Sequence, residues 1–183
     1  MKGPTVVKVG GGLASTPGAL DSVATVLATA GRTARILVVP GGGRFADAVR
    51  AFARAESLSE DAAHWMAILG MEQYAHALAE RIPALLVEEP GGIRAALDGA
   101  GVAVLAPYRW MRAADVLPHT WDATSDSVAA FVAGALDAER LVLVKPVDGD
   151  RGLVDPCFES VLPVGLPWAV VGWARLGEVL SAP

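Results

Sequence analysis

The chain is poor in the residues that make covalent or metal cross-links. It contains one cysteine, Cys157, among 183 residues. A single cysteine cannot form an internal disulfide or a cysteine metal cluster, and this usage is typical of a reducing compartment. Charged residues are also scarce at 19%, whereas 53% of the residues are hydrophobic. This balance excludes disorder as the main state and provides enough apolar side chains for a large core.

Positive charge and long apolar runs are scarce as well. Fifteen Lys and Arg residues against 20 Asp and Glu residues give a formal net charge of −5. That balance argues against a nucleic acid or an anionic membrane as the main partner. No apolar stretch approaches the ~18 residues of a membrane span, and Lys8 interrupts the one run that could serve as a signal-peptide core. We therefore expect a soluble, cytoplasmic protein with a single domain over residues 1–183.

Short β-branched runs alternate with longer helical segments along the chain, which is typical of an α/β fold with a mostly parallel sheet. The longest predicted helix, Ser59–Arg81, is apolar around most of its circumference, so we expect it to be buried. The predicted strands are Thr5–Val9, Arg35–Val39, Ala84–Glu88, Val102–Ala106, Leu141–Lys145 and Trp168–Val171. The other predicted helices are Gly18–Ala30, Phe45–Ala55, Thr124–Leu136 and Leu176–Leu180.

Three consecutive glycines follow each of the first two predicted strands. Backbone N–H groups in such loops can form a nest for an anion, although a tight strand-to-helix turn is an equally good explanation of the first loop taken alone. Loops at the carboxyl ends of neighbouring parallel strands open into one crevice, where α/β sheets bind ligands. Neither loop has the spacing of a P-loop or of a dinucleotide-binding fingerprint. The two loops are Gly10, Gly11 and Gly12, and Gly41, Gly42 and Gly43.

Few cations are available to meet an anion in that crevice. The chain has three lysines, of which Lys8 and Lys145 fall at predicted strand ends facing the crevice. Arg44 follows the second glycine loop directly and can fork onto a phosphate or carboxylate, or simply be solvated in the first helical turn. Asp47, farther along the same helix, is more simply interpreted as an acid on the helix face.

Carboxylates and hydroxyls gather at the start of the predicted helix at residue 124. Asp122 and Asp126 are candidates for holding a lysine in place or for helping to bind Mg²⁺ indirectly, while ordinary N-capping by Thr124 or Ser125 is the simpler explanation. His119, close to Trp121, is the best polar and aromatic candidate for contact with an acceptor.

Two other histidines lie on the longest predicted helix. His64 shares a face with Ile68 and Met71 and is expected to be a buried, hydrogen-bonded core residue. His76 is expected to lie at the surface.

Taken in order, these segments resemble the amino acid kinase superfamily, whose members include N-acetylglutamate kinase, UMP kinase, aspartokinase and isopentenyl phosphate kinase. The resemblance covers roughly Val6 to Gly149. Its motifs are KVGGG at residues 8–12, PGGG at 40–43, TSDSVAA at 124–130 and VDG at 147–149. The pieces PGGGRFAD, AAHWMAILGMEQYA, PHTWDATSDSVAA and VDPCF look most like one subgroup. That subgroup comprises the kinases of methanofuran biosynthesis, which phosphorylate [5-(aminomethyl)furan-3-yl]methyl phosphate (below, the aminomethylfuran phosphate) to the diphosphate.

The resemblance implies a three-layer αβα sandwich in which ATP, Mg²⁺ and a phosphorylated small-molecule acceptor meet above the carboxyl edge of the sheet. Lys8 would contact the transferred phosphoryl group, Asp126 would orient the phosphate-binding lysines, and Lys145 would complete the catalytic set. The first glycine loop would cradle ATP phosphates, with Asp148 and Gly149 in the nucleotide site. The acceptor site would comprise the second glycine loop with Arg44, His119 and Asp122. Family habits also imply a homodimer or higher homo-oligomer.

Two departures from the family pattern leave alternatives open. Residues 150–183 are all that follow Gly149, so we expect a shortened nucleotide-binding part. Lys145-Pro146 also stands where many relatives have Ser or Thr followed by Asp. The alternatives are a non-catalytic ligand-binding or assembly protein on the same fold, and a kinase for a carboxylate or carbamate acceptor.

Overall fold

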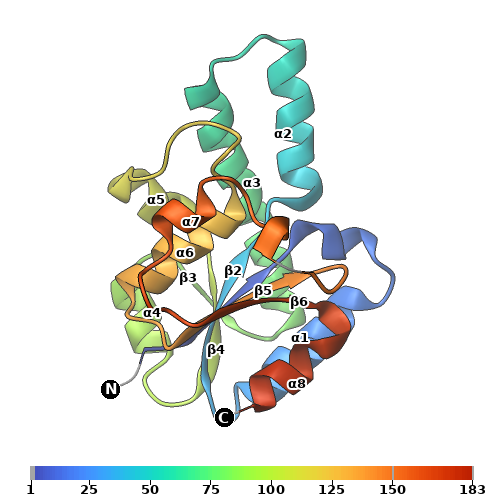
Figure 1. Ribbon diagram of the computed structural model, residues 1–183, viewed down its shortest axis with the longest axis vertical. Helices are drawn as coiled ribbons and strands as arrows, with labels where there is room; N and C mark the ends of the chain where they lie inside the picture. The colour runs from blue at the N-terminus through green and yellow to red at the C-terminus, as the bar shows by residue number, and fades with distance from the viewer. Residues whose placement is uncertain (1–2, 150, 183) are drawn as a thin grey trace.

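A six-stranded sheet forms the centre of the molecule, for which a computed structural model describes residues 3–149 and 151–182 (Figure 1). The strand order is β3-β4-β2-β1-β5-β6, and every neighbouring pair is parallel. The prediction of an α/β fold with a parallel sheet is thus confirmed, with a strand at each of the six predicted places. The strands are β1 (Thr5–Val9), β2 (Arg35–Pro40), β3 (Leu85–Val87), β4 (Gly101–Leu105), β5 (Arg140–Lys145) and β6 (Trp168–Gly172).

The helices connect and cover these strands. They are α1 (Ala19–Ala30), α2 (Gly43–Ala55), α3 (Glu60–Arg81), α4 (Pro90–Ala96), α5 (Tyr108–Ala114), α6 (Ser125–Ala135), α7 (Phe158–Val161) and α8 (Leu176–Ser181). Three 3₁₀ turns also occur, η1 (Gly11–Ser15), η2 (Arg151–Leu153) and η3 (Trp173–Arg175). All five predicted helices are present, whereas the short helices α4, α5 and α7 were not predicted. Among the described residues, no helix has both the length and the apolar character that crossing a bilayer demands.

The strands are buried on both faces, which gives the molecule three layers. All five residues of β1 are buried, and alternate side chains enter opposite cores. Val6 packs with the core formed by α4, α5, α6 and α7, whereas Val7 packs with that of α1 and α8. Helix α3 contributes side chains to both cores. In Figure 1, α1 and α8 lie together on one side and α6 and α7 on the other.

Strand β1 lies at the switch point of the sheet. The chain adds β2, β4 and β3 on one side of β1, and then adds β5 and β6 on the other side. Val9 pairs with Pro40 on one side and with Val144 on the other. The carboxyl ends of these three strands therefore meet, and with them both glycine loops and Lys145. Crevices at such switch points are where open α/β sheets bind ligands.

Helices α2 and α3 form a pair that projects beyond the sheet (Figure 1). Helix α3 begins after Ser59, whose side chain accepts a hydrogen bond from the Ala62 N–H at 3.2 Å. The predicted burial of this helix holds over part of it: residues 63–65 and Ile68 are buried, but Leu69 is 40% exposed. His76 is exposed, as predicted.

Candidate active site

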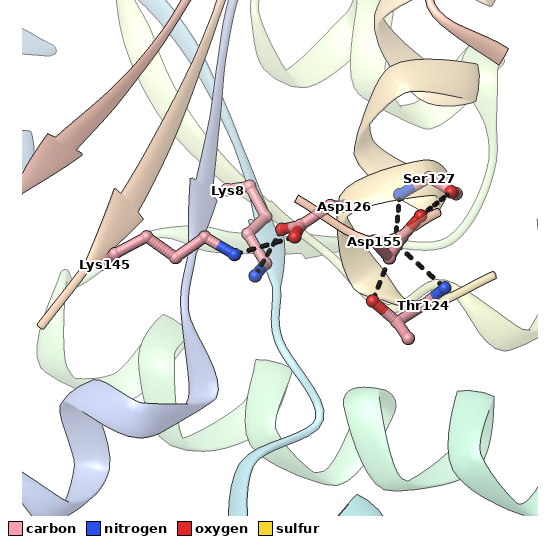
Figure 2. Close-up of polar contacts among 6 residues, drawn as sticks. All are labelled: Lys8, Thr124, Asp126, Ser127, Lys145 and Asp155. Atoms are coloured by element: carbon pink, nitrogen blue, oxygen red, sulfur yellow. Dashed lines mark hydrogen bonds and ion pairs between the residues drawn. The ribbon is translucent and has the colours of Figure 1, made fainter. Parts of the chain in front are cut away.

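Two lysines share one carboxylate at the carboxyl edge of the sheet. Lys8 Nζ, on β1, lies 2.7 Å from Asp126 Oδ1 as an ion pair, and Lys145 Nζ, at the end of β5, donates to Asp126 Oδ2 at 2.7 Å (Figure 2). Lys8 is 4% exposed and Asp126 is 3% exposed. Because strands β1 and β5 are neighbours, residues 137 positions apart in sequence reach the same carboxylate. With both amines protonated, the cluster carries a net charge of +1, an arrangement that favours an anion.

Asp126 serves in this cluster as a permanently ionised carboxylate. Burial by itself would raise its pKa, but Lys8 and Lys145 together outweigh burial and lower it. Burial lowers the pKa of Lys8 more than the attraction of Asp126 raises it, and Lys145 lowers it further. Both oxygens of Asp126 are engaged by cations, so this carboxylate orients the lysines and is not free to accept a proton.

A second carboxylate, Asp155, occupies the N-terminal end of α6. It accepts hydrogen bonds from the Thr124 N–H at 3.0 Å, the Thr124 hydroxyl at 2.7 Å and the Ser127 N–H at 3.0 Å, and also from the Ser127 hydroxyl (Figure 2). Thr124 stands at the N-cap position, but its side chain makes no capping bond. The predicted capping by Thr124 or Ser125 is therefore wrong, because a distant carboxylate satisfies the first turn.

The two glycine loops pack directly against one another. A Cβ on Gly11 would lie 2.1 Å from Gly43 N, and a Cβ on Gly41 would lie 2.4 Å from Gly11 N. Gly43 also has a φ of +52°, which disfavours any side chain. The loops need glycine for this close approach, whatever ligand they bind.

A pocket with a volume of about 240 Å³ opens beside the glycine loops. It has three walls, which are α2, the first half of α3 and the segment that leads into α6. Charged, aromatic and apolar side chains are all present in the lining of the pocket. The lining residues are Gly11, Gly12, Gly42, Gly43, Ala46, Asp47, Arg50, Glu60, His64, Ala67, Ile68, Met71, Thr120, Trp121, Ala123, Thr124 and Ser125.

Comparison with known families agrees with this architecture. The model of the amino acid kinase family matches residues 3–149. The chain belongs to the amino acid kinase family. Among curated proteins, it is similar to the [5-(aminomethyl)furan-3-yl]methyl phosphate kinase of Methanocaldococcus jannaschii, with 28% identity over 115 residues. That match covers 63% of this chain and 53% of the relative, so the chain spans about half the length of the curated relative it matches.

Solved structures of two other kinases share the fold. The uridylate kinase of Archaeoglobus fulgidus superimposes with a TM-score of 0.77 at 16% identity, covering 98% of this chain and 96% of that one. The UMP kinase of Bacillus anthracis gives a TM-score of 0.68 at 15% identity, covering 98% and 91%. The three-layer amino acid kinase fold expected from the sequence is therefore confirmed.

Several residues predicted for the site do not line the pocket of this family member. Arg44 and Asp122 are exposed, and neither belongs to the pocket lining among the described residues. His119 lies behind the pocket wall: its Nδ1 is 2.7 Å from Asp61 and its Nε2 is 2.8 Å from Asp115. Roles in acceptor binding for these three residues stay predictions.

The residues predicted for the nucleotide site lie in the loop after β5. Asp148 Oδ1 accepts a hydrogen bond from the Gly172 N–H at 2.8 Å, which ties this loop to the end of β6. Gly149 follows in the same loop, where a Cβ would collide with the side chain of Leu153. The structure therefore gives both residues a part in shaping the loop, and nucleotide binding by them stays a prediction.

Sequence reasoning missed most of the pocket walls. His64, expected in the core, lines the pocket, as does Asp47, expected to be an ordinary surface acid. Neither Arg50 nor Glu60 was predicted to belong to the site. Their helical spacing was the available signal, since Ala46 and Arg50 on α2, like Glu60 and His64 on α3, are four residues apart and share a helix face.

The described residues contain no cluster of side chains that would hold a metal ion by themselves. No group of three or more His, Cys, Asp or Glu side chains among them could hold a metal ion, and Asp126 is already bound by two lysines. The set of donors fits a polyphosphate better, because two lysines and backbone N–H groups all provide donors to anionic oxygens.

Proposed function

We propose that this protein is an ATP-dependent kinase that transfers the γ-phosphoryl group of ATP to a small phosphomonoester. The acceptor that we favour is the aminomethylfuran phosphate, which would become the diphosphate. The proposal depends above all on the Lys8–Asp126–Lys145 cluster, whose Asp126 directly follows Ser125, a lining residue of the pocket that the glycine loops border. The activity for which the M. jannaschii relative is named supports this choice of acceptor.

In the proposed reaction, an oxygen of the acceptor phosphate attacks the γ-phosphorus of ATP. A new P–O bond forms, the bond to the β-phosphate oxygen breaks, and ADP leaves. A phosphomonoester is already ionised at neutral pH, so no residue has to remove a proton from it. This agrees with the position of Asp126, whose two oxygens are both held by lysines.

The lysines supply positive charge where negative charge accumulates. An ammonium group has three N–H donors, so Lys8 and Lys145 each retain two after contacting Asp126. Because Asp126 fixes both amines before substrates arrive, little reorganisation is needed as the phosphoryl group moves. The N–H groups of Gly10 and Gly41 already donate to strand carbonyls, so neutral donors to the same oxygens would come from the later glycines of each loop. Because no cluster of three or more metal-ligating side chains occurs among the described residues, we assign Mg²⁺ no step.

A coupled ADP-release assay tests this proposal with ATP and Mg²⁺. The acceptor panel contains the aminomethylfuran phosphate, isopentenyl phosphate, UMP, N-acetylglutamate and carbamate. We expect turnover with the aminomethylfuran phosphate and little with the other four acceptors. Replacing Lys8 by Met should lower kcat by about 10²–10³-fold or more, the usual loss when a transition-state donor is removed.

An exposed cation outside the site provides the control. Arg32→Met changes a residue at the end of α1 and should leave kcat unchanged. Turnover that survives Lys8→Met would show that the site is wrongly assigned. ATP binding by calorimetry without turnover on any acceptor would instead favour a non-catalytic relative.

A further inference from the structure

The pocket lining includes charged groups that phosphoryl transfer does not use. Glu60, in the first turn of α3, has no ion-pair partner among the described residues. Asp47 pairs with Arg50 at 3.1 Å, and the Arg50 guanidinium also lies 4.4 Å from the centre of the Trp121 ring. The positive charge of Arg50 is therefore already engaged by a carboxylate and by an aromatic face. Among the charged residues of the lining, this leaves the negative charge of Glu60 without a partner.

His64 provides a second and independent sign of a ligand. Its side chain is 8% exposed and lines the pocket, yet it makes no hydrogen bond to any residue in the described part of the chain. The ring stacks on His119 at 4.3 Å between centroids and meets Trp65 edge-on at 4.8 Å. The ring therefore has hydrogen-bonding capacity that a ligand or water in the pocket can use.

The surroundings of His64 keep its ring uncharged. Burial lowers the pKa of His64, and the neighbouring His119 lowers it further. Hydrogen bonds to Asp115 and Asp61 raise the pKa of His119, although slight burial opposes them, so His119 is the more basic ring of the stacked pair. A neutral imidazole has one nitrogen with a free lone pair, which accepts a hydrogen bond.

We propose that Glu60 and His64 form a subsite for a protonated amine, carried by the acceptor at the end away from its reacting phosphate. Glu60 would supply the opposite charge, and His64 would accept one N–H of the ammonium group. His64 and Trp121 both line this pocket and add aromatic surface to it. This inference rests on the proposed function and deepens it, because it defines the acceptor as a small phosphomonoester with an amine. The acceptor named for the M. jannaschii relative contains an aminomethyl group.

Comparing two acceptors in the same kinase assay tests the subsite. One is the aminomethylfuran phosphate, and the other is the (5-methylfuran-3-yl)methyl phosphate, which lacks the amine. We expect the unmodified protein to favour the amine by about 10–100-fold in kcat/KM, mainly through KM, as for a hydrogen bond to a charged group. The preference should fall to about threefold or less in Glu60→Gln, and it should weaken in His64→Leu.

Matched controls lie on the exposed side of the same helix. Glu80→Gln and His76→Leu make the same chemical changes at exposed positions of α3 and should keep the full preference. His64→Gln retains a hydrogen-bond acceptor and should preserve more of the preference than His64→Leu. If His64→Leu fails to fold, Glu60→Gln still decides, because Glu60 is exposed to solvent at the start of the helix.

The outcomes separate this inference from the proposed function. Equal kcat/KM for the two acceptors in the unmodified protein would overturn the subsite while leaving the kinase intact. If neither acceptor is phosphorylated, the proposed function fails, and calorimetric binding of the same two compounds decides about the subsite. Tighter binding of the amine that Glu60→Gln abolishes would then support the subsite, and equal or undetectable binding would overturn it.

Discussion

Replacing Asp126 by Asn should destabilise the protein strongly, because it leaves the buried amine of Lys8 without its counter-ion. Lys8 is 4% exposed, and its partner carboxylate is 2.7 Å away. Breaking such a buried pair by removing one member costs about 3–5 kcal/mol. For a chain of this length, that loss corresponds to a fall in Tm of about 6–20 °C. Domains typically have a free energy of unfolding of about 5–15 kcal/mol. Over most of these values, the variant would remain folded at room temperature.

The origin of this loss can be isolated with a second variant and with pH. Lys8→Met combined with Asp126→Asn removes the unpaired charge and should recover most of the free energy of unfolding. In Asp126→Asn alone, the pKa of Lys8 in the folded state would lie still farther below its ordinary value. The unfolded chain then binds more protons, so raising the pH from 7 towards 10 should progressively stabilise this variant.

Urea unfolding followed by tryptophan fluorescence provides the measurement, since the chain has five tryptophans. Phosphate is left out of the buffer, because an anion bound by the two lysines would mask the loss. A loss below about 1 kcal/mol for Asp126→Asn would refute the reasoning, since it would lie within the range of exposed ion pairs. The reasoning would be refuted equally if Asp126→Asn lost stability by the expected amount but neither a higher pH nor the added Lys8→Met change restored it. The unpaired amine of Lys8 would then not be the cause.

Three further predictions concern the surroundings of the site. Asp155→Ala removes a carboxylate that accepts four hydrogen bonds at the start of α6. It should lower the free energy of unfolding, measured with urea, by about 1–3 kcal/mol. A decrease below about 0.5 kcal/mol would contradict this. Gly11→Ala forces the glycine loops apart and should lower kcat/KM by about 100-fold, whereas Gly91→Ala, in open space, should leave it unchanged. In NMR titrations, His119 should titrate above 6.5 and His64 below it. The stability contributed by His119 is present below pH 6.5 and is lost as the pH rises through its raised pKa. The difference in free energy of unfolding between the unmodified protein and His119→Gln should therefore shrink above pH 6.5. A difference that stays constant with pH would contradict this.

The sheet and its functional edge were predictable because their signals are local in sequence. Parallel strands buried on both faces appear as short, continuous apolar runs, and each of the first two runs ends in glycines. Lys8 and Lys145 stood out because lysines are so few and both fall at strand ends. The resemblance to the family then supplied Asp126 as the residue that connects them.

The rest of the site depends on contacts that no local pattern records. Asp155 lies 31 residues from Thr124, so nothing near the start of α6 reveals that its first turn is capped from elsewhere. His64 shares its helix face with Ile68 and Met71, and that spacing is the same whether the face meets a core or a pocket. Only the arrangement of α2 and α3 around the cavity distinguishes the two cases.

The short helices α4, α5 and α7 escaped prediction for a related reason. Each has seven residues or fewer, so it spans too few turns for a helical period to emerge. Helix α4 begins with Pro90 and two glycines, residues that normally indicate a turn. Packing onto the sheet stabilises these helices, with Ile93 and Trp110 contributing buried side chains.

The central place of β1 has a consequence for how the chain is made. Strand β1 can pair with β2 once residue 40 has left the ribosome, but its other neighbour, β5, begins only at Arg140. At synthesis rates of about 5–20 residues per second, the free side of β1 would wait roughly 5–20 s. During that time it is an apolar edge on which Lys8 is the one charged residue, and a lysine on such an edge discourages pairing with other chains. The lysine proposed to bind phosphate would thus also protect the nascent protein from aggregation, and Lys8→Met should lower soluble yield in cells.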